Sequence, residues 1–218
     1  MDTLKLNAIL RQSPYLTKQN LALALSKEGE NLNYWIKKLT KEKRLIRLKK
    51  GLYASSYYLD LISQEPKNRE VYFEYLANVL RFPSYVSLEY VLSNSGLLPE
   101  AAFAITSVTV KTPRVYTSGV GTFIYRNIKD ALFSDYGSKD FNGKKVRIAS
   151  LAKALFDFLY LKKFIPFATA REYLLREGRI NWEVLSTEDK IEFTKLVERS
   201  GSGKMRLIVA LLKREKVL

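Results

Sequence analysis

The sequence predicts an α+β protein, in which an N-terminal helical domain ends in a basic hairpin and a larger second domain mixes antiparallel strands with helices. Three observations support this prediction. Residues 31–53 join an amphipathic helical pattern to a hairpin pattern, and the polar segment SQEPKN at residues 63–68 then interrupts the periodicity. Beyond it, helical stripes flank segments rich in β-branched residues. We therefore expect two domains, residues 1–62 and residues 63–218.

The first helix is predicted from Leu6, Ile9 and Leu10, which give it one apolar edge. The pair Ser13-Pro14 should end it, because the residue before a proline is pushed out of the helical region. This edge should pack against the next two helices. The expected core of the N-terminal domain consists of Leu6, Ile9, Leu10, Leu21, Leu25, Trp35, Ile36 and Leu39.

Thr17 is the expected N-cap of a second helix, since its hydroxyl can accept a hydrogen bond from a free amide in the first turn. Leu16 and Leu21 stand where a hydrophobic staple would place them. Because Asn20 occupies the third helical position, where Glu or Gln is usual, no full capping box is expected. The helix should end before Gly29.

A third helix is predicted with two different faces. Leu32, Trp35, Ile36 and Leu39 form a complete apolar stripe, with Asn31 as the expected N-cap. Since Trp35 lies on this stripe, we expect it to pack in the core and not to stack on a base. The opposite face carries Tyr34, Lys37, Lys38, Lys41 and Arg44.

A basic hairpin follows the third helix. Residues 45–48 and 52–54 are the expected strands, and Gly51 in the turn can supply the positive φ that such loops commonly need. From Lys37 to Lys50 there are eight Lys or Arg and one acid, Glu42. These charges repel one another unless an anion binds, and a phosphate backbone is such an anion. Three helices and a basic wing therefore predict a winged helix-turn-helix that binds double-stranded DNA.

In that docking mode the third helix enters the major groove, and the wing lies along the backbone or minor groove. Asn31, Asn33 and Tyr34 are candidates for contacts to base edges, because Asn can bond adenine bidentately. Lysines of the helix and the wing should hold phosphates. The predicted DNA-binding residues are Thr17, Lys18, Gln19, Asn31, Asn33, Tyr34, Lys37, Lys38, Lys41, Arg47, Lys49 and Lys50. Because the rest of the chain is also basic, a second basic surface is expected at Lys111, Arg114 and Arg126.

The composition excludes several kinds of chemistry. The 218 residues include neither Cys nor His, and their net charge is +15. Thiolate nucleophiles, Ser-His-Asp catalysis and His-based metal sites are therefore excluded, and we predict no catalytic residue, no metal and no cofactor. No signal peptide is recognisable, and no apolar run reaches the roughly 18 residues that span a bilayer. We expect a soluble, cytoplasmic protein.

The second domain should begin with a helix over residues 71–80 that ends before Pro83, followed by a short helix over residues 87–94. Residues 103–111, 121–128 and 145–148 are expected strands, with TPR and TSGVG as turn material between the first two. Ser150 can then cap a helix with an apolar stripe. Further helices are expected near residues 168–177, 187–199 and 204–216.

The order of these segments is similar to that of one known family. After the predicted winged helix come YVSLEYVLSNSGLLPE (residues 85–100), AITSVTVKTPR (104–114), GTFIYRNI (121–128) and IASLAKALFDFLYL (148–161). Nearly the whole chain thus resembles the AbiE-type antitoxins, the transcriptional-regulator halves of type IV abortive-infection toxin–antitoxin pairs. Lys153, Ala154, Leu155 and Asp157 match the family's Lys-Ala-Leu-x-Asp helix, although Ser150-Leu151 replaces the Pro-Glu that usually precedes it. The resemblance implies a repressor of its own operon, with a C-terminal domain needed to neutralise a nucleotidyltransferase-like toxin.

Two further motifs have ordinary structural interpretations. Gly201-Ser202-Gly203-Lys204 resembles the end of a phosphate-binding loop, but Glu198 and Met205 stand where that motif has Gly and Ser or Thr. Since it joins two predicted helices, we interpret it as an interhelical turn. Lys153 and Asp157 are four residues apart, and we expect a helix-surface ion pair worth about 0.2–0.5 kcal/mol.

Two alternative functions stay open at this point. Asp135, Asp140 and Asp157 could ligate Mg²⁺ in a nucleic-acid enzyme that a winged helix targets, although they form no recognisable acidic motif. Hydrolysis of nucleic acid by the purified protein with Mg²⁺ would favour this alternative. The chain could also be a protein-interaction module whose basic surface masks an acidic toxin.

Overall fold

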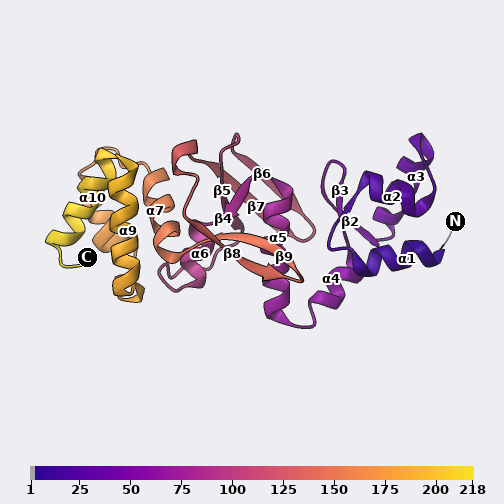
Figure 1. Ribbon diagram of the computed structural model, residues 1–218, viewed down its shortest axis with the longest axis horizontal. Coiled ribbons are helices and arrows are strands. Elements are labelled where there is room, and N and C mark those ends of the chain that lie inside the picture. The colour runs from indigo at the N-terminus through magenta and orange to yellow at the C-terminus, as the bar shows by residue number, and fades with distance from the viewer. Residues whose placement is uncertain (1–2) are drawn as a thin grey trace. The chain divides into compact units, whose positions relative to one another are not determined.

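The computed structural model describes residues 3–218 and confirms the α+β class (Figure 1). The chain divides into two compact units. Unit 1 comprises Met1–Leu80 with Val115–Phe123, and unit 2 comprises Arg81–Arg114 with Ile124–Leu218. Along the chain the division falls after Leu80, so the boundary expected near residue 62 lies inside unit 1.

Unit 1 opens with three helices and three short strands (Figure 1). The strands form an antiparallel sheet of order β1-β3-β2. Strand β1 has only two residues and was not predicted, because periodicity cannot identify so short a strand. The elements are α1 (Thr3–Gln12), β1 (Leu16–Thr17), α2 (Lys18–Leu25), α3 (Gly29–Lys41), β2 (Leu45–Lys49), β3 (Leu52–Ser55), α4 (Ser56–Ile62) and α5 (Pro66–Leu80).

The predicted core of the N-terminal domain is confirmed. One apolar cluster fills the space between the first three helices and the sheet. Its buried members include Leu6, Leu10, Leu21, Leu25, Ile36 and Leu39, and Ile9 and Trp35 pack against it, partly buried. Leu16, Leu45 and Tyr53 complete the cluster from the strands.

Two predictions about helix starts are wrong. Helix α2 does have a capping box: the Thr17 hydroxyl accepts the Asn20 N–H at 3.1 Å, and Asn20 Oδ1 accepts the Thr17 N–H at 3.0 Å. The amide oxygen of Asn20 thus serves as the acceptor that Glu or Gln usually provides. Helix α3 begins at Gly29, so Asn31 is not its N-cap but its third residue.

Helix α5 joins unit 1 through its buried side. The Tyr72 hydroxyl donates a 2.7 Å hydrogen bond to the Pro14 carbonyl, which precedes β1. Burial, and then the nearby Tyr58 and Tyr75 rings, raise the pKa of the Tyr72 hydroxyl. A cut at residue 62 would remove this bond, which explains why the polar segment at residues 63–68 does not end the unit.

A six-stranded sheet has the order β6-β7-β5-β4-β9-β8. In unit 2, β4 pairs antiparallel with β5 and parallel with β9, and β8 pairs antiparallel with β9. The strands predicted at residues 103–111, 121–128 and 145–148 are confirmed as β5, β7 and β9, whereas β4 and β8 were not predicted. The prediction that TPR and TSGVG form only turns is wrong, because Arg114, Thr117 and Ser118 belong to β6. The strands are β4 (Ser84–Val86), β5 (Ile105–Thr109), β6 (Arg114–Ser118), β7 (Gly121–Asn127), β8 (Tyr136–Phe141) and β9 (Lys144–Ala149).

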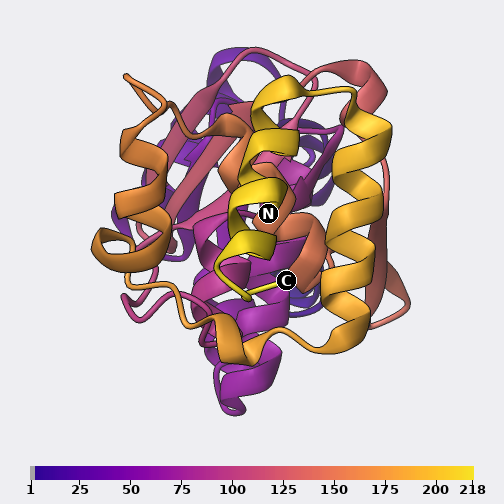
Figure 2. The ribbon, with the colours of Figure 1, turned by 90° about the vertical axis from the view of Figure 1, so that its left-hand side faces the viewer.

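The predicted helices of unit 2 are confirmed, whereas the short 3-10 helices η1 and η3 were not predicted. Ser150 caps α7, since its hydroxyl accepts the Lys153 N–H at 3.1 Å. Helices α9 and α10 lie side by side and both contact α7 (Figure 2). No helix in residues 3–218 is long and apolar enough to cross a membrane. The helices are α6 (Glu89–Asn94), η1 (Asp130–Leu132), α7 (Leu151–Leu161), α8 (Thr169–Glu172), the π-helical turn η2 (Tyr173–Glu177), η3 (Trp182–Val184), α9 (Thr187–Ser200) and α10 (Gly203–Arg214).

Candidate nucleic-acid interface

Helix α3 has the two faces that its sequence predicts. Leu32, Ile36 and Leu39 are buried. The opposite side, which we call the basic face of α3, consists of the exposed residues Asn33, Tyr34, Lys37, Lys38 and Lys41. Within residues 3–218 none of its three lysines has an ion-pair partner. Their charges are therefore available to an external anion.

The basic face of α3 is ordered along the helix. Asn33, Lys37 and Lys41 are spaced four residues apart and form one row on the helix surface. Tyr34 and Lys38 form the neighbouring row; Tyr34 is 62% exposed, and the Lys38 ammonium lies 4.7 Å from the centre of the partly buried Trp35 ring. Amide and phenol groups thus come first, and ammonium groups follow toward the C-terminus.

The wing is basic, but not all of its cations are free. Arg47 on β2 and Lys50 in the turn are exposed, and Gly51 has a φ of +77°, as predicted. Lys49 is half-buried: its ammonium donates a 2.7 Å hydrogen bond to the Leu80 carbonyl and lies 5.9 Å from the Tyr116 ring centre. One of the three donors of Lys49 is therefore used within unit 1, and its contact with a phosphate stays a prediction.

The start of α2 contributes less than predicted. Lys18 and Gln19 are exposed in its first turn, whereas the Thr17 hydroxyl is used in the capping box. Asn31 is exposed on the first turn of α3. Asn33 and Tyr34 belong to the second turn and not the first, because α3 begins three residues earlier than predicted.

Arg44 does not belong to the basic face of α3. Its guanidinium donates a 2.7 Å hydrogen bond to the Asn7 side chain and lies 5.8 Å from the centre of the Tyr57 ring. The residue follows the end of α3, where the helical wheel used for the prediction no longer applies.

The second basic surface is reduced to two free cations. Lys111 and Arg114 are exposed. Arg126 forms a 2.9 Å ion pair with Glu89, which uses one of its five donors.

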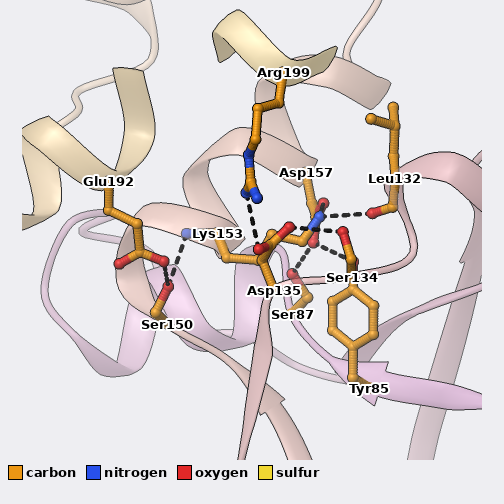
Figure 3. A network of polar contacts seen from close by, with 10 residues as sticks. All are labelled: Tyr85, Ser87, Leu132, Ser134, Asp135, Ser150, Lys153, Asp157, Glu192 and Arg199. Carbon is orange, nitrogen blue, oxygen red and sulfur yellow. Dashed lines mark hydrogen bonds and ion pairs between the residues drawn. The ribbon is translucent and has the colours of Figure 1, made fainter. Parts of the chain in front are cut away.

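A buried polar network lies on α7 and corrects the prediction for Lys153 and Asp157 (Figure 3). Their side chains are only 1% and 0% exposed, and Lys153 Nζ lies 2.8 Å from Asp157 Oδ1. The lysine also donates to the Leu132 carbonyl at 2.9 Å. Asp157 Oδ2 accepts hydrogen bonds from the hydroxyls of Tyr85, at 2.8 Å, and Ser87, at 2.9 Å. The pair is an internal charge pair and not a surface one.

Burial dominates the titration of this network. Loss of solvent raises the pKa of Asp157, and the Lys153 ammonium and the hydrogen bonds oppose only part of that change. Burial and the neighbouring Asp157 carboxylate raise the pKa of Tyr85, so its hydroxyl keeps its proton. The network can hold strands and helices of unit 2 together, because β4, the segment after it, η1 and α7 each supply a member.

Further contacts tie α9 to the same region (Figure 3). The Arg199 guanidinium lies 2.8 Å from Asp135, which also accepts a 2.6 Å hydrogen bond from Ser134. The Ser150 hydroxyl donates to Glu192 at 2.7 Å.

The aspartates considered for Mg²⁺ have separate partners. Asp135 pairs with Arg199, Asp157 pairs with Lys153, and Asp140 accepts the Gly143 N–H at 3.1 Å in the β8–β9 turn. Among residues 3–218 no group of three or more acidic side chains is placed to hold a metal.

The glycine-rich turn joins α9 to α10, as interpreted from the sequence. Gly201, with a φ of +63°, ends α9, and Ser202 caps α10. The Lys204 ammonium donates to the carbonyls of Leu159, Tyr160 and Lys162 at 2.8, 2.5 and 2.9 Å. These carbonyls lie at the C-terminal end of α7, where a helix leaves acceptors unsatisfied. Burial lowers the pKa of Lys204.

A scan against protein-family models and a search of curated proteins find no match to this chain.

Proposed function

We propose that the protein is a DNA-binding transcriptional regulator, in which α3 enters the major groove of duplex DNA and the β2–β3 hairpin contacts the backbone or the minor groove. The observation that carries this proposal is the basic face of α3, where Lys37, Lys38 and Lys41 are exposed without ion-pair partners within residues 3–218. The order α1-β1-α2-α3-β2-β3 supports it, because a winged helix has this order of elements.

The contacts are assigned by chemistry. The ammonium groups of Lys37, Lys38 and Lys41 bind phosphates, and Arg47 and Lys50 on the wing do the same. Asn33 and Tyr34 contact base edges, as does Asn31 in the preceding turn, because amide groups can bond a base bidentately. Lys18 and Gln19 are exposed at the start of α2, from which backbone phosphates are reached in helix-turn-helix docking.

We further propose that this regulator is the antitoxin of a type IV toxin–antitoxin pair, repressing its own operon and neutralising a nucleotidyltransferase-like toxin. The support is the order of motifs that resembles the AbiE-type antitoxins, and the burial of Lys153 and Asp157 gives two of its matched residues a physical role. A nucleotidyltransferase-like reading frame beside the gene is expected. Co-expression of the full chain with that toxin should restore growth, and failure to do so would leave only a DNA-binding regulator.

The salt dependence of binding tests the DNA contacts. Replacing Lys37, Lys38 and Lys41 together by Ala should weaken binding to operator and random duplex alike, and should reduce the slope of log K against log salt by about three. The matched control removes the same charge from exposed positions of unit 2, through Lys163→Ala, Lys195→Ala and Lys213→Ala. An unchanged slope in the α3 variant would exclude the basic face of α3 from the interface.

A single substitution tests base recognition. Asn33→Ala should lose about 1–3 kcal/mol of binding free energy on the operator and almost none on random duplex. Gln19→Ala, another exposed amide, should change both affinities equally if it contacts only backbone. Equal losses for Asn33→Ala on both duplexes would make it a positioning contact.

A further inference from the structure

Unit 2 contains a cavity of about 530 Å³ that the proposed DNA contacts do not use. Most of its wall is apolar, with Leu98, Ile124 and Phe158 among the lining residues. Phe103 belongs to the same wall and is 99% exposed. A cavity of this size with an apolar wall and a few polar groups is typical of a small-molecule site.

The cavity contains a cation without an ion-pair partner among residues 3–218. Lys162 Nζ lies 3.7 Å from the centre of the Tyr173 ring and 5.8 Å from that of Phe158. It has no hydrogen bond or ion pair with any residue from 3 to 218. Burial lowers the pKa of Lys162, and the charge of Arg126 adds to this effect while Glu89 and Glu177 oppose it. Such an ammonium ion gains most from a ligand that supplies a negative charge.

A second cation, Arg126, lines the same cavity, together with a carboxylate, that of Glu89, in which one oxygen has no hydrogen bond within the described residues. Arg126 uses one donor in its 2.9 Å contact with Glu89 Oε1, and a guanidinium has five. Glu89 Oε2 is buried and has no hydrogen-bond partner within the described residues. Glu100 and Glu177 add two more carboxylates to the lining, and Arg179 pairs with Glu100 at 3.3 Å, so that three acids face three bases. A ligand with several negative charges would therefore leave an excess of negative charge in the cavity.

Two unusual backbone conformations lie at residues that line or adjoin the cavity. Tyr173 begins a π-helical turn, closed by the Gly178 N–H donating to the Tyr173 carbonyl at 2.8 Å. A Cβ at Gly178 would lie 2.7 Å from that carbonyl oxygen and 3.0 Å from the ring, so only glycine allows Tyr173 this position. Directly before the lining residue Glu89, Leu88 has a φ of +62°. Such turns and strained residues are concentrated at functional sites.

We propose that this cavity binds a small monocarboxylate with an aromatic or aliphatic body, held by the Lys162 ammonium with the Arg126 guanidinium, while its apolar body covers Phe158 and Phe103. The single charge follows because Lys162 is the one cation of the lining that has no ion-pair partner among residues 3–218. The site is independent of the proposed DNA interface, and its test uses no DNA.

Calorimetric titration of the full chain tests the ligand class. Phenylacetate should bind with a dissociation constant below about 10 mM, the range open to a ligand of this size. 2-Phenylethanol and phenyl phosphate, which keep the ring but have no charge or a second charge, should bind at least about ten-fold more weakly. Absence of phenylacetate binding would overturn the proposal, and so would equal or tighter binding of either analogue.

Variants test the residues. Lys162→Gln should weaken phenylacetate binding about ten-fold or more, whereas the neighbouring exposed Lys163→Gln, which does not line the cavity, should leave it unchanged. Gly178→Ala should also weaken binding, because it displaces the Tyr173 ring without changing any charge. Equal affinities in wild type and a folded Lys162→Gln variant would overturn the assignment.

If Lys162→Gln does not fold, the pH dependence of phenylacetate binding to the wild type tests the role of Lys162. Since the pKa of Lys162 is lowered, phenylacetate affinity should decline at a pH below the ordinary lysine value, while binding of 2-phenylethanol should not. A carboxylate affinity that is constant through that range would overturn the role of Lys162.

Discussion

Helices α3 and α7 both carry a lysine and a charged residue four positions later, yet they use them in opposite ways. On α3, Lys37 and Lys41 are both exposed, both positive and unpaired with any acid in residues 3–218. On α7, Lys153 and Asp157 are opposite in charge and fully buried. The same spacing therefore leaves charge available to a partner in unit 1 and cancels it internally in unit 2.

The difference teaches that solvent decides what an i,i+4 charge pair does. In water, ions four residues apart interact by only tenths of a kcal/mol, so like charges can be kept for binding at little cost to folding. In the interior an unpaired charge costs several kcal/mol, so a buried lysine requires its carboxylate and its hydrogen bonds. We therefore expect substitutions on α7 to affect folding and those on α3 to affect binding.

The largest effect is expected from breaking the buried pair. Lys153→Met leaves the Asp157 carboxylate buried without its cation, and should lower the free energy of unfolding by about 3–5 kcal/mol in chemical denaturation. The α3 counterpart Lys37→Met should change it by less than about 0.5 kcal/mol. Combining Lys153→Met with Asp157→Asn, which keeps acceptors for Tyr85 and Ser87, should recover more than half of the loss. A Lys153→Met variant as stable as the wild type would contradict the charge pairing.

Alkaline pH should give a smaller effect on stability, which arises from the buried side chain of Tyr85. The unfolded chain loses tyrosine protons above pH about 10, whereas the buried Tyr85 keeps its proton because its pKa is raised. The folded state then keeps one more proton at Tyr85, so the stability that this residue contributes is complete below pH 10 and decreases by about 1.4 kcal/mol per pH unit above it. Tyr85→Phe should remove this contribution to the slope. Equal slopes in wild type and Tyr85→Phe would contradict the raised pKa.

The smallest expected effect on stability separates folding from binding on α3. Lys37→Glu replaces a like-charge pair with Lys41 by an opposite-charge pair, and should stabilise the protein by about 0.2–0.5 kcal/mol. The same substitution should weaken DNA binding more than Lys37→Gln does, because it repels phosphate. Thermal denaturation and gel-shift titration of both variants measure the two effects. A Lys37→Glu variant that binds DNA as the wild type does would remove Lys37 from the interface.

Sequence periodicity predicts most of the helices, because their apolar residues recur at helical spacing and face a core. It does not predict α4 (Ser56–Ile62), which follows β3 directly. It misses β1 and β4, which have two and three residues, and β8, whose pattern YGSKDF has no regular alternation. It also misplaces the start of α3, because no side chain caps that helix and Glu28 stands at the N-cap position.

The candidate sites differ in how far the sequence alone predicts them. Exposed lysines of α3 follow from the stripe opposite them, but the engagement of Lys49 depends on Leu80, which is remote in sequence. Spacing alone could not reveal that Lys153 is buried. The run LAKALFDFLYL did carry a signal, since a helix that is apolar on nearly all sides is a buried one, and residues 152–159 are all buried. The cavity depends on a π-helical turn at Tyr173, which no local pattern predicts.

Lys204, in the first turn of α10, holds that helix to the end of α7 through its ammonium group. Its three donors are directed at three carbonyls, including that of Lys162. An acetylated side chain would keep one N–H and no charge, and the planar fork of arginine cannot converge on three oxygens as an ammonium does. Loss of the Lys204 ammonium would therefore leave three carbonyls at the end of α7 without this donor, including that of Lys162, whose own ammonium lies in the cavity.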